Sequence, residues 1–480
     1  MDIDEYVKLY RQNFKSTSSS LTNTVMIISD LFGVMLAIGV GFFFVNLYDP
    51  VSINFRSFLT YWPYLPVFIA VFQVSALYPG ISMAPAEEMR RIFIGCLMSF
   101  GGIMLSRYIE DQALDAIQAA FLISFVFSTV ILMFCRSVMR RILAKTGKNG
   151  IPAVIYSSGA IGRMIVDKLL DKRRLGYRPV LILDNDVSVG ESYRDIPIIH
   201  NTGIGPEIVE KLKIKIAIVA IDHIKRKDLV QLLNDSVSAF RYNIMIPDFF
   251  GLTSIWMSAR DFDGILGLAA TARLKMPWNL TIKRLVDIVI VIAGGLAILP
   301  ILLIIALLIK VSSKGPVLYR QKRIGKNGKY FYAYKFRTMV LDADKKLEEL
   351  LQNDSAARQE WEANQKIKND PRVTAFGKFL RRLSLDELPQ LLNVLKNDMS
   401  LVGPRPIVDA EIPKYGYDFK RIFSVKPGIT GLWQVSGRSD TDYSDRVSFD
   451  TYYLQSWSIW LDLWILYKTV GAVLLKRGAY

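Results

Sequence analysis

Residues 288–309 read IVIVIAGGLAILPILLIIALLI and form an uncharged, apolar stretch. As a helix, these 22 residues would be about 33 Å long, enough to cross the hydrocarbon layer of a membrane. Basic residues flank the stretch on both sides, Lys283-Arg284 before it and Lys310 and Lys314 after it, and such residues stay on the cytoplasmic side. Pro300 near the middle removes a helix hydrogen bond and clashes with the preceding turn. We therefore predict a helix that breaks at Pro300 and enters and leaves by the same face, with a straight fifth span as the alternative.

Four other apolar stretches precede this one. They are Val25–Leu47, Trp62–Tyr78, Ile92–Leu105 and Ala116–Phe134. Lys and Arg residues gather before the first stretch, after the second and after the fourth. This charge pattern predicts four transmembrane spans with both ends of the bundle in the cytoplasm. Buried helices of a large soluble core are the alternative, which the scarcity of charge in four successive stretches disfavours.

The composition fits a membrane protein that handles phosphate. The 480 residues are 51% hydrophobic, with a mean hydropathy of +0.26 and a net charge of +16. The positive excess favours an anionic membrane surface or a nucleotide as partner, and we expect no nucleic-acid partner. Two Cys exclude a disulfide framework and a Cys-rich zinc site. Because His200 and His223 are the only His residues, catalysis is expected to depend on carboxylates, Lys and Arg.

Residues 150–250 change to an alternation of predicted strands and helices. Such alternation is typical of a parallel α/β sheet. The turn after the first strand, Ser157–Gly162, matches half of the dinucleotide fingerprint, since Ser157 replaces the first glycine. Asp184 follows the second strand, where a ribose-binding acid is expected. We predict a Rossmann-like module that acts as a scaffold or dimerisation unit, with nucleotide binding as the alternative.

The densest chemical signal lies between Asp370 and Pro406. Ser384 and Glu387 have the spacing of a capping box, which is a purely structural role for Glu387. The box leaves the neighbouring Asp386 unexplained. A helix start here would place a carboxylate pair at a helix N-terminus, which favours anions and phosphate. Neighbouring carboxylates also suit Mg²⁺, which takes one or two such ligands together with substrate phosphates.

Cationic side chains surround that pair in the sequence. Arg recognises phosphate through its planar guanidinium, although a run of charges is more often a solvated or lipid-facing surface. Upstream lie Arg320, Lys322 and Arg323. The candidate phosphate-binding residues are Lys335, Arg337, Arg381, Arg382, Arg405 and Arg438. Lys335 and Arg337 have strand spacing and share one face, and two prolines stiffen the backbone around Arg405.

The C-terminal segment Tyr452–Tyr467 is rich in aromatic residues, among them Trp457, Trp460 and Trp464. Trp and Tyr prefer the membrane interface, so we predict a helix that lies in the plane of the bilayer. Ordinary core packing of these aromatics is the alternative.

The ordered motifs of residues 283–480 resemble a known family. They are Gly315-Pro316-Val317, Gln321–Gly325, Tyr334–Met339, Asp370-Pro371-Arg372, Ser384–Gln390, Asp398–Pro406 and Lys426–Trp433. Together they resemble the catalytic domain of bacterial polyprenol-phosphate phosphoglycosyl transferases with a single re-entrant membrane helix. The whole chain resembles the long form of that family, with four N-terminal spans and a middle α/β module.

The resemblance implies an activity, partners and a location. These enzymes transfer a hexose 1-phosphate, here galactose 1-phosphate or alternatively glucose 1-phosphate, from a UDP-hexose to undecaprenyl phosphate and release UMP. Such transfer is the first membrane step in the assembly of O-antigen, capsule or exopolysaccharide. It implies a bacterial inner membrane and a cytoplasmic catalytic domain. Separately from the resemblance, we expect a homodimer through the middle α/β module.

The resemblance also implies residue roles. Asp386 matches the nucleophile that forms an aspartyl phospho-sugar, and Glu387 matches the carboxylate associated with Mg²⁺. The family's helix break usually reads Ser-Pro, whereas this chain has Leu299-Pro300.

Three rival functions make different demands on the sequence. A membrane-bound UDP-sugar dehydratase needs Tyr-x-x-x-Lys, and no Tyr here has a Lys four residues later. A glycosyltransferase with a D-x-D metal site is compatible with Asp184-Asn185-Asp186 and Asp440-Thr441-Asp442. A non-enzymatic membrane scaffold would not need the cluster of carboxylates and Arg residues.

The expected fold is a membrane protein of mixed class. It combines a four-helix transmembrane bundle (1–145), a Rossmann-like α/β module (150–262), a re-entrant membrane helix (280–311) and an α+β catalytic domain (312–480).

Overall fold

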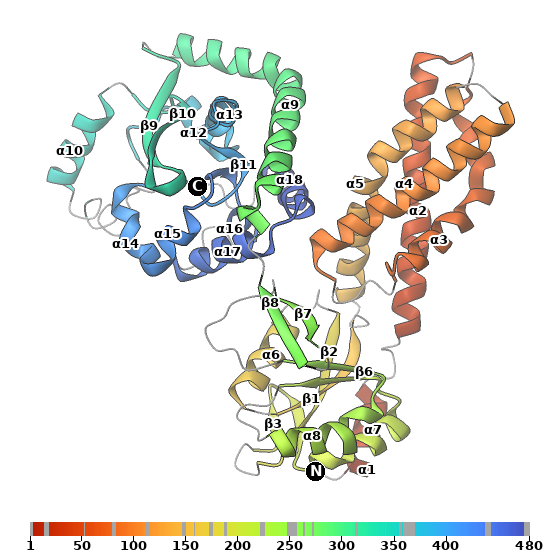
Figure 1. Cartoon of the computed structure of the whole chain (residues 1–480). Helices are drawn as coiled ribbons and strands as arrows, with labels where there is room; N and C mark the ends of the chain where they lie inside the picture. The colour runs from red at the N-terminus through yellow and green to blue at the C-terminus, as the bar shows by residue number, and fades with distance from the viewer. Residues whose placement is uncertain are drawn as a thin grey trace. The chain divides into compact units, whose positions relative to one another are not determined.

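The computed structural model covers the whole chain and describes most of it. It describes all residues except 1–2, 14–18, 52, 79–82, 112–114, 146–149, 158, 172–175, 187–189, 221–225, 247–256, 263–264, 271–272, 313–314, 341, 355–357, 359–369, 437–442 and 475–480. Contacts between residues divide the chain into two compact units, Met1–Gly251 and Leu252–Tyr480 (Figure 1). The finer division into four domains that the sequence suggested stays a prediction.

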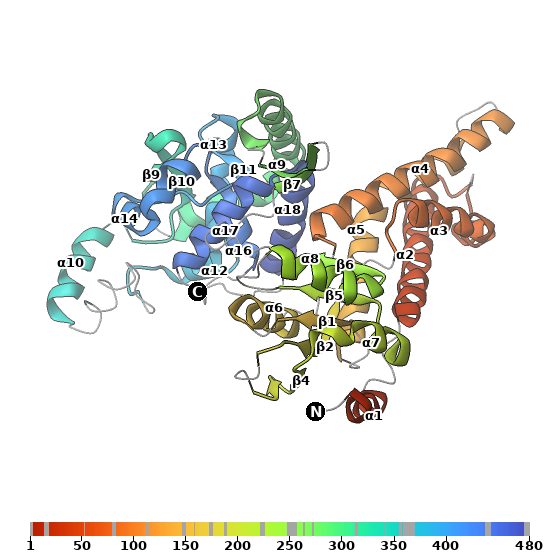
Figure 2. The ribbon, with the colours of Figure 1, turned by 60° about the horizontal axis from the view of Figure 1, so that its bottom comes forward.

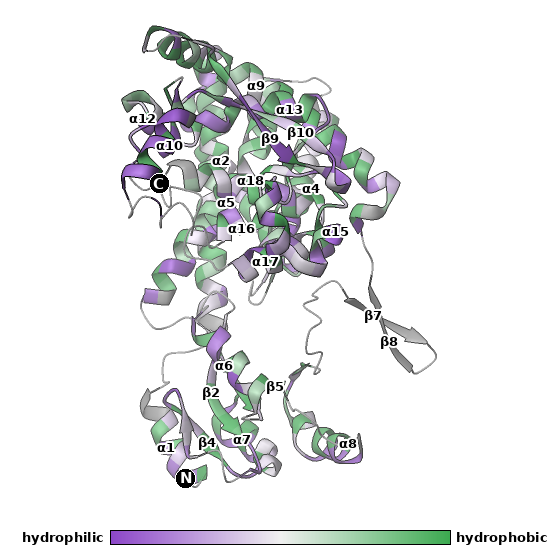
Figure 3. Cartoon of the chain, turned by 90° about the vertical axis from the view of Figure 1, so that its left-hand side faces the viewer, coloured by the Kyte–Doolittle hydropathy of each residue, from purple (hydrophilic) through white to green (hydrophobic). Residues whose placement is uncertain are grey.

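The first unit begins with a short helix and a series of apolar helices. Their bounds are α1 (Ile3–Asn13), α2 (Ser19–Tyr48), η1 (Phe55–Tyr64), α3 (Leu65–Val74), α4 (Pro85–Asp111) and α5 (Ala116–Lys145). Among the described residues, four segments of this unit are long and apolar enough to cross a membrane, and Figure 3 shows the green of hydrophobic residues along α2 and α5. The second of them begins at Phe55, earlier than the expected Trp62, because the 3-10 helix η1 leads directly into α3. Helix α2 packs along α5, and α4 packs against both α3 and α5.

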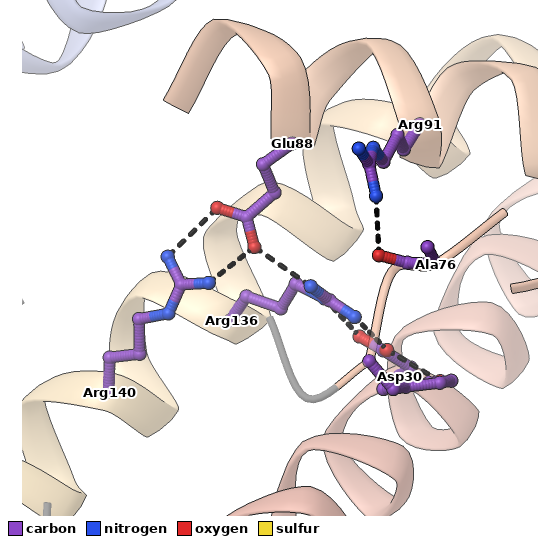
Figure 4. A network of polar contacts seen from close by, with 7 residues as sticks. Asp30, Ala76, Glu88, Arg91, Arg136 and Arg140 are labelled. Carbon is purple, nitrogen blue, oxygen red and sulfur yellow. Dashed lines mark hydrogen bonds and ion pairs between the residues drawn. The ribbon is translucent and has the colours of Figure 1, made fainter. Parts of the chain in front are cut away.

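A buried ion network joins α2, α4 and α5 (Figure 4). Arg136 on α5 donates from Nε and Nη2 to Asp30 on α2, at 2.7 and 2.5 Å, and from Nη1 to Glu88 on α4 at 2.8 Å. Arg140, one turn further along α5, also donates to Glu88, and Tyr78 donates to Asp30. The charge pattern of the sequence predicts that the basic residues after the fourth stretch flank the span. Helix α5 instead extends to Lys145, so both arginines lie within it and pair with the two carboxylates.

A six-stranded sheet follows, in the order β3-β4-β2-β1-β5-β6. Its elements are β1 (Ile151–Tyr156), α6 (Ala160–Asp171), β2 (Tyr177–Leu183), β3 (Ser192–Tyr193), β4 (Ile196–Ile199), α7 (Gly205–Leu212), β5 (Ile216–Val219), α8 (Arg226–Asp235) and β6 (Tyr242–Met245). All neighbouring strands are parallel except β3 and β4. Helix α6 packs on one face of the sheet, and α1, α7 and α8 pack on the other. The predicted α/β sheet is thus present, with β1 at its centre as in Rossmann-like folds.

The first turn of this sheet explains the incomplete fingerprint. Ser157 has a φ of 103°, a value that glycine adopts far more readily. Its Oγ accepts a hydrogen bond from Gly159 N at 3.1 Å, which stabilises the tight turn without the missing glycine. A Cβ on Gly162 would lie 2.2 Å from Ser157 O, so the last glycine of the pattern is required for packing.

Helix α1 packs on this α/β module. Figure 2 shows α1 next to α7. The Tyr6 hydroxyl donates to Val180 O at 2.8 Å, and Lys211 pairs with Asp4 at 2.8 Å. Helix α1, which precedes the first apolar helix, thus packs on the module that follows α5.

The second unit contains three two-stranded sheets and a long apolar helix. Its main elements are β7 (Met257–Phe262), β8 (Ile265–Ala270), α9 (Pro277–Ser312), β9 (Leu318–Ile324), β10 (Tyr330–Phe336), α10 (Ala343–Asn353), α12 (Ala375–Arg382), η8 (Leu385–Gln390), α13 (Leu391–Leu395), β11 (Ser400–Val402), β12 (Gly428–Thr430), α16 (Leu432–Ser436), α17 (Tyr443–Ser456) and α18 (Ile459–Leu474). The β9–β10 and β7–β8 pairs are antiparallel, and β11–β12 is parallel. The β7–β8 hairpin lies in this unit and does not join the six-stranded sheet.

Helix α9 bends but remains helical throughout. It includes Pro300, and Figure 1 shows its ribbon turning sharply so that the last turns run across the earlier ones. The expected break is thus a bend within one continuous helix. Near its start, Lys283 pairs with Asp462 at 2.7 Å, and Asp287 accepts from Ser400 Oγ at 2.6 Å.

The last turns of α9 pack on the same unit. Ile305 and Ile309 share a buried cluster with Phe336 and Leu380. Both arms of α9 therefore contact a single globular domain.

The aromatic C-terminal segment is largely part of the core. Trp457 and Trp464 are buried, at 4% and 7% exposure, and Trp457 Nε1 donates to Asp462 at 3.0 Å. Core packing, the alternative interpretation, describes these two residues. The interfacial helix predicted over Tyr452–Tyr467 stays a prediction, since aromatic density alone does not separate an interface from a core.

Candidate active site

The carboxylate pair lies in a tight turn rather than at the start of an α-helix. Ser384 has a φ of 54°, and the following residues form the 3-10 helix η8, while the short helix α13 begins only at Leu391. The Ser384 side chain makes no capping hydrogen bond. Glu387 instead extends towards β10. The capping box is therefore not formed, and Glu387 is available for another role.

Glu387 lines a pocket together with cations from three other segments. The lining residues are Arg323, Ala333, Lys335, Glu387, Gln390, Arg405, Pro406, Gly428, Ile429 and Gln434. The pocket has a volume of about 290 Å³, including space open to solvent. Strands β9 and β10 supply one wall, and the loop after β11 and strand β12 supply another.

The charge of Glu387 is fixed by these cations. Lys335 Nζ donates to Glu387 Oε1 at 2.7 Å. Burial by itself raises the pKa of Glu387, but Lys335, Arg405 and Arg323 outweigh burial and lower it to about 2. Glu387 is therefore ionised throughout the physiological pH range.

Asp386 has the opposite electrostatic environment. It is buried, at 8% exposure, and is not among the pocket-lining residues that the structure describes. Burial and the neighbouring charge of Glu387 raise its pKa, while Lys335 and Arg381 oppose the rise. A raised pKa makes the carboxylate more basic, which suits a nucleophile.

Close backbone packing places Arg405 at the pocket. A Cβ on Gly428 would lie 2.1 Å from Gly403 N, so only glycine allows the two chain segments to approach this closely. The Arg405 guanidinium lies over the Trp433 ring, 5.9 Å from its centroid. Burial and the charge of Arg405 lower the pKa of Arg323, which indicates that the two cations are close to each other.

The predicted site residues fall into three groups. Glu387, Lys335 and Arg405 meet in the pocket, next to Asp386. Arg381 donates from Nε to Thr338 Oγ1 at 2.9 Å, and its charge acts on Asp386. Elsewhere, Arg337 is buried just after β10, Arg382 is exposed on α12, and Arg438 lies outside the described residues.

The pocket also contains residues that the sequence analysis did not assign to it. Arg323 is one of the cations upstream of the carboxylate pair, Gln390 is the last residue of the motif Ser384–Gln390, and Gln434 lies outside the quoted motifs. The alternation of β9 carries a signal for Arg323, because it shares a strand face with Gln321. No pattern in the sequence singles out the two glutamines.

The chemistry of the carboxylate pair suits a magnesium ion. Among the described residues, no group of three or more His, Cys, Asp or Glu side chains is placed to hold a metal. Mg²⁺ needs no such group, because one or two carboxylates and substrate phosphates suffice. Glu387 satisfies the requirement for an ionised oxygen ligand, and Asp386 is its neighbour.

Of the two D-x-D motifs, Asp184-Asn185-Asp186 lies among the described residues, and it does not line the pocket. Asp184 Oδ1 accepts a hydrogen bond from Asp186 N at 3.0 Å in a loop of the α/β module. The second motif, Asp440-Thr441-Asp442, lies outside the described residues.

Comparison with known proteins agrees with this site. The family model described as bacterial sugar transferase matches residues 278–476, and a model described as CoA-binding domain matches residues 78–239. The undecaprenyl-phosphate galactose phosphotransferase of Salmonella typhimurium is 37% identical over 81% of this chain and 79% of its own length. The UDP-glucose:undecaprenyl-phosphate glucose-1-phosphate transferase of Escherichia coli is 33% identical over 74% of this chain and 75% of its own. The exopolysaccharide production protein ExoY of Rhizobium meliloti is 48% identical, over 41% of this chain and 88% of its own.

The chain belongs to the bacterial sugar transferase family and is a sugar-phosphate transferase. The family resemblance drawn from the sequence motifs is therefore confirmed. The matched region contains α9, both carboxylates and every pocket-lining residue. The scaffold and dehydratase alternatives do not describe this domain.

Proposed function

We propose that this protein transfers a hexose 1-phosphate from a UDP-hexose to undecaprenyl phosphate and releases UMP. The observation that carries the proposal is the pairing of two adjacent carboxylates with opposite environments. Asp386 has a raised pKa, whereas Glu387 is held ionised by Lys335 and the pocket arginines. Such a separation suits one carboxylate for covalent chemistry and the other for binding cations.

The first step is attack by the Asp386 carboxylate on the sugar-side phosphorus of the diphosphate. A bond forms between Asp386 oxygen and phosphorus, and the bond from phosphorus to the bridging oxygen breaks. The electron pair stays on the bridging oxygen, which leaves as part of UMP. Asp386 then carries the sugar phosphate as an acyl phosphate.

The second step transfers the sugar phosphate to lipid. An oxygen of undecaprenyl phosphate attacks the same phosphorus, the bond to Asp386 breaks, and the carboxylate is regenerated. The product is a lipid-linked diphosphosugar.

The pocket supplies charge stabilisation for both steps. Arg323 and Arg405 are positioned to bind diphosphate oxygens, and Lys335 holds Glu387 in place. Mg²⁺ held by Glu387, with Asp386 beside it, would neutralise part of the diphosphate charge.

We also propose that the protein is anchored by a four-helix transmembrane bundle and a re-entrant α9. In a straight helix, Asp287 and Ile309 would lie about 33 Å apart, on opposite sides of a bilayer. Here both ends of α9 pack on the same domain, which supports entry and exit by one face. The packing of α1 on the α/β module likewise supports an even number of spans before that module. With the positive residues inside, the catalytic domain lies on the cytoplasmic side of the bacterial inner membrane.

Galactose is the first candidate for the hexose and glucose the second. The Salmonella relative named for galactose covers more of this chain than the Escherichia coli relative named for glucose. We assign the product to surface polysaccharide assembly, and we propose a homodimer through the α/β module.

Purified protein in nanodiscs, given undecaprenyl phosphate, Mg²⁺ and one UDP-sugar at a time, tests this function. We expect UMP release and lipid-linked product with UDP-galactose, and much less with UDP-N-acetylhexosamines. Product from UDP-glucose alone would assign the glucose alternative. Release of UDP in place of UMP would overturn the proposal, because it would mean transfer of the sugar without its phosphate.

A further inference from the structure

The β9–β10 hairpin has two chemically different faces. Register pairs Tyr334 with Arg320 and Tyr332 with Lys322, so these even-numbered residues share one face. The odd-numbered residues Arg323, Ala333 and Lys335 point to the opposite face, where they line the active-site pocket.

The even face is an exposed surface of tyrosines and cations. Tyr330 and Tyr332 are 55% and 59% exposed. Lys322 Nζ lies 3.8 Å from the centroid of the Tyr330 ring, and the Arg320 guanidinium lies 5.5 Å from that of Tyr334. Lys396, just after α13, donates to the Tyr334 hydroxyl at 2.7 Å.

Two carboxylates approach this face at its edges. Tyr330 donates its hydroxyl to Asp409 at 2.6 Å, and Asp398 lies close enough to act on Tyr334. The cations Arg320, Lys322 and Lys396 still outnumber them.

The same face continues into the apolar arm of α9. Phe336, two residues beyond Tyr334, is on the even face and packs with Ile305 and Ile309. The outer side of this arm exposes Leu303 and Leu307, at 63% and 64%. Moving from α9 along the hairpin, the surface therefore changes from aliphatic to aromatic and basic. This is the order of side chains that a protein presents from the hydrocarbon layer outward to the headgroups.

We propose that the even face of the β9–β10 hairpin, formed by Arg320, Lys322, Tyr330, Tyr332, Tyr334 and Lys396, docks on the anionic headgroup layer of the membrane. The docking fixes the tilt of the catalytic domain relative to the membrane. The opposite face of the hairpin lines the active-site pocket. The proposal rests on the re-entrant arrangement of α9 proposed above.

A proximity measurement in vesicles tests this docking. In a full-length variant without its two native cysteines, Tyr332→Cys carries a fluorophore. The protein is reconstituted in phosphatidylcholine, with or without phosphatidylglycerol, and with a nitroxide on a fraction of the headgroups. We expect strong quenching at position 332 that increases with phosphatidylglycerol. A probe introduced by Tyr417→Cys, which is also exposed but lies outside this surface, should stay bright.

Charge reversal supplies the matched control. Arg320→Glu with Lys322→Glu should reduce the docked fraction, by roughly fivefold for each lost cation. Lys345→Glu with Lys346→Glu on the exposed helix α10 changes the net charge equally and should leave the quenching unchanged. Both double variants should still exchange UMP into UDP-sugar. This exchange shows that the protein is folded and that the active-site pocket is intact.

Two results would overturn the docking. One is equal quenching at 332 in neutral and anionic vesicles and in both double variants. The other is a probe at 332 that is shielded without quenching, which would point to a protein partner. Labelling of a cysteine at Ser312 with a thiol reagent applied outside intact cells tests the re-entrant arrangement by itself. A failure of that arrangement can therefore be told apart from a failure of the docking.

Discussion

Asp386 and Glu387 are neighbours whose chemistry is separated by their contacts. Glu387 faces Lys335 and two pocket arginines, whereas Asp386 is buried beside Glu387 and near Arg381. The turn that starts at Ser384 in a left-handed conformation makes this possible, because it points adjacent side chains into different environments. One short segment thereby provides both a basic carboxylate and a permanently charged one.

The first prediction concerns the salt bridge of Glu387. Lys335→Met removes the largest influence that lowers the pKa of Glu387, so this pKa should rise from about 2. Activity should fall by about 100-fold, the usual cost of losing one charged group at such a site. In a profile of kcat/KM against pH, the acid limb should move to higher pH. A Lys345→Met variant, on the exposed helix α10, serves as the control and should keep the wild-type profile.

The second prediction concerns a buried acid outside the pocket. Burial raises the pKa of Asp450 to about 8, although its hydrogen bond from Tyr415 and the charge of Arg446 oppose the rise. The folded state therefore holds a proton that the unfolded state releases near pH 4. The free energy of unfolding should decrease as the pH rises from about 4 to about 8.

Thermal unfolding in nanodiscs checks this pH dependence. Asp450→Asn mimics the protonated acid, so its Tm relative to wild type should be higher at pH 8 than at pH 5. A difference in Tm that is the same at both pH values would contradict the assignment.

At the scale of single elements, α9 is governed by Pro300 and by what its two arms contact. Proline removes one backbone hydrogen bond and clashes with the preceding turn, so the helix bends there. Contacts from Lys283, Asp287, Ile305 and Ile309 then hold both arms to the domain.

The third prediction concerns the topology of α9. Single cysteines at Thr281 and at Ser312, in a background without Cys96 and Cys135, should both resist a membrane-impermeant thiol reagent applied to intact cells. Pro300→Leu should expose a fraction of the molecules at Ser312, because proline costs about 3 kcal/mol in a helix interior and its loss favours a straight span. Labelling of Ser312 from outside in the variant that keeps Pro300 would refute the re-entrant arrangement.

The fourth prediction concerns the ion network of the apolar helices. Arg136→Met leaves Asp30 and Glu88 buried with one cation fewer, which should cost about 3–5 kcal/mol. We expect a lower Tm and a lower yield of folded protein. Arg141→Met, an exposed change on the same helix, should have little effect. Combining Arg136→Met with Asp30→Asn and Glu88→Gln should recover most of the lost stability. If no stability is recovered, the network contributes through the packing of its side chains and not through their charges.

At the scale of the whole molecule, the sequence predicted those features that repeat or that carry motifs. The four apolar helices, the parallel sheet and the meeting of Lys335, Glu387 and Arg405 all follow from hydropathy or from ordered motifs. The pairing of Arg136 with Asp30 did not, because the two residues are 106 positions apart and each looks like an isolated charge.

Two other features were missed because they depend on tertiary packing. The burial of Trp457 and Trp464 depends on which face of α18 meets the domain, and composition gives no information on this. The left-handed turn at Ser384 replaced the expected helix start, because Lys335 offers Glu387 a stronger partner than a backbone amide.

The central claim is that Asp386 becomes covalently bonded to the sugar phosphate. A covalent route releases UMP before the lipid binds. The enzyme given UDP-galactose, Mg²⁺ and radiolabelled UMP, without undecaprenyl phosphate, should therefore exchange label into UDP-galactose. Mass spectrometry should find a hexose-phosphate adduct on Asp386. Asp386→Asn should abolish both exchange and adduct while keeping the wild-type Tm, and Glu387→Gln should slow the exchange without moving the adduct. Exchange at the wild-type rate in Asp386→Asn would contradict the account.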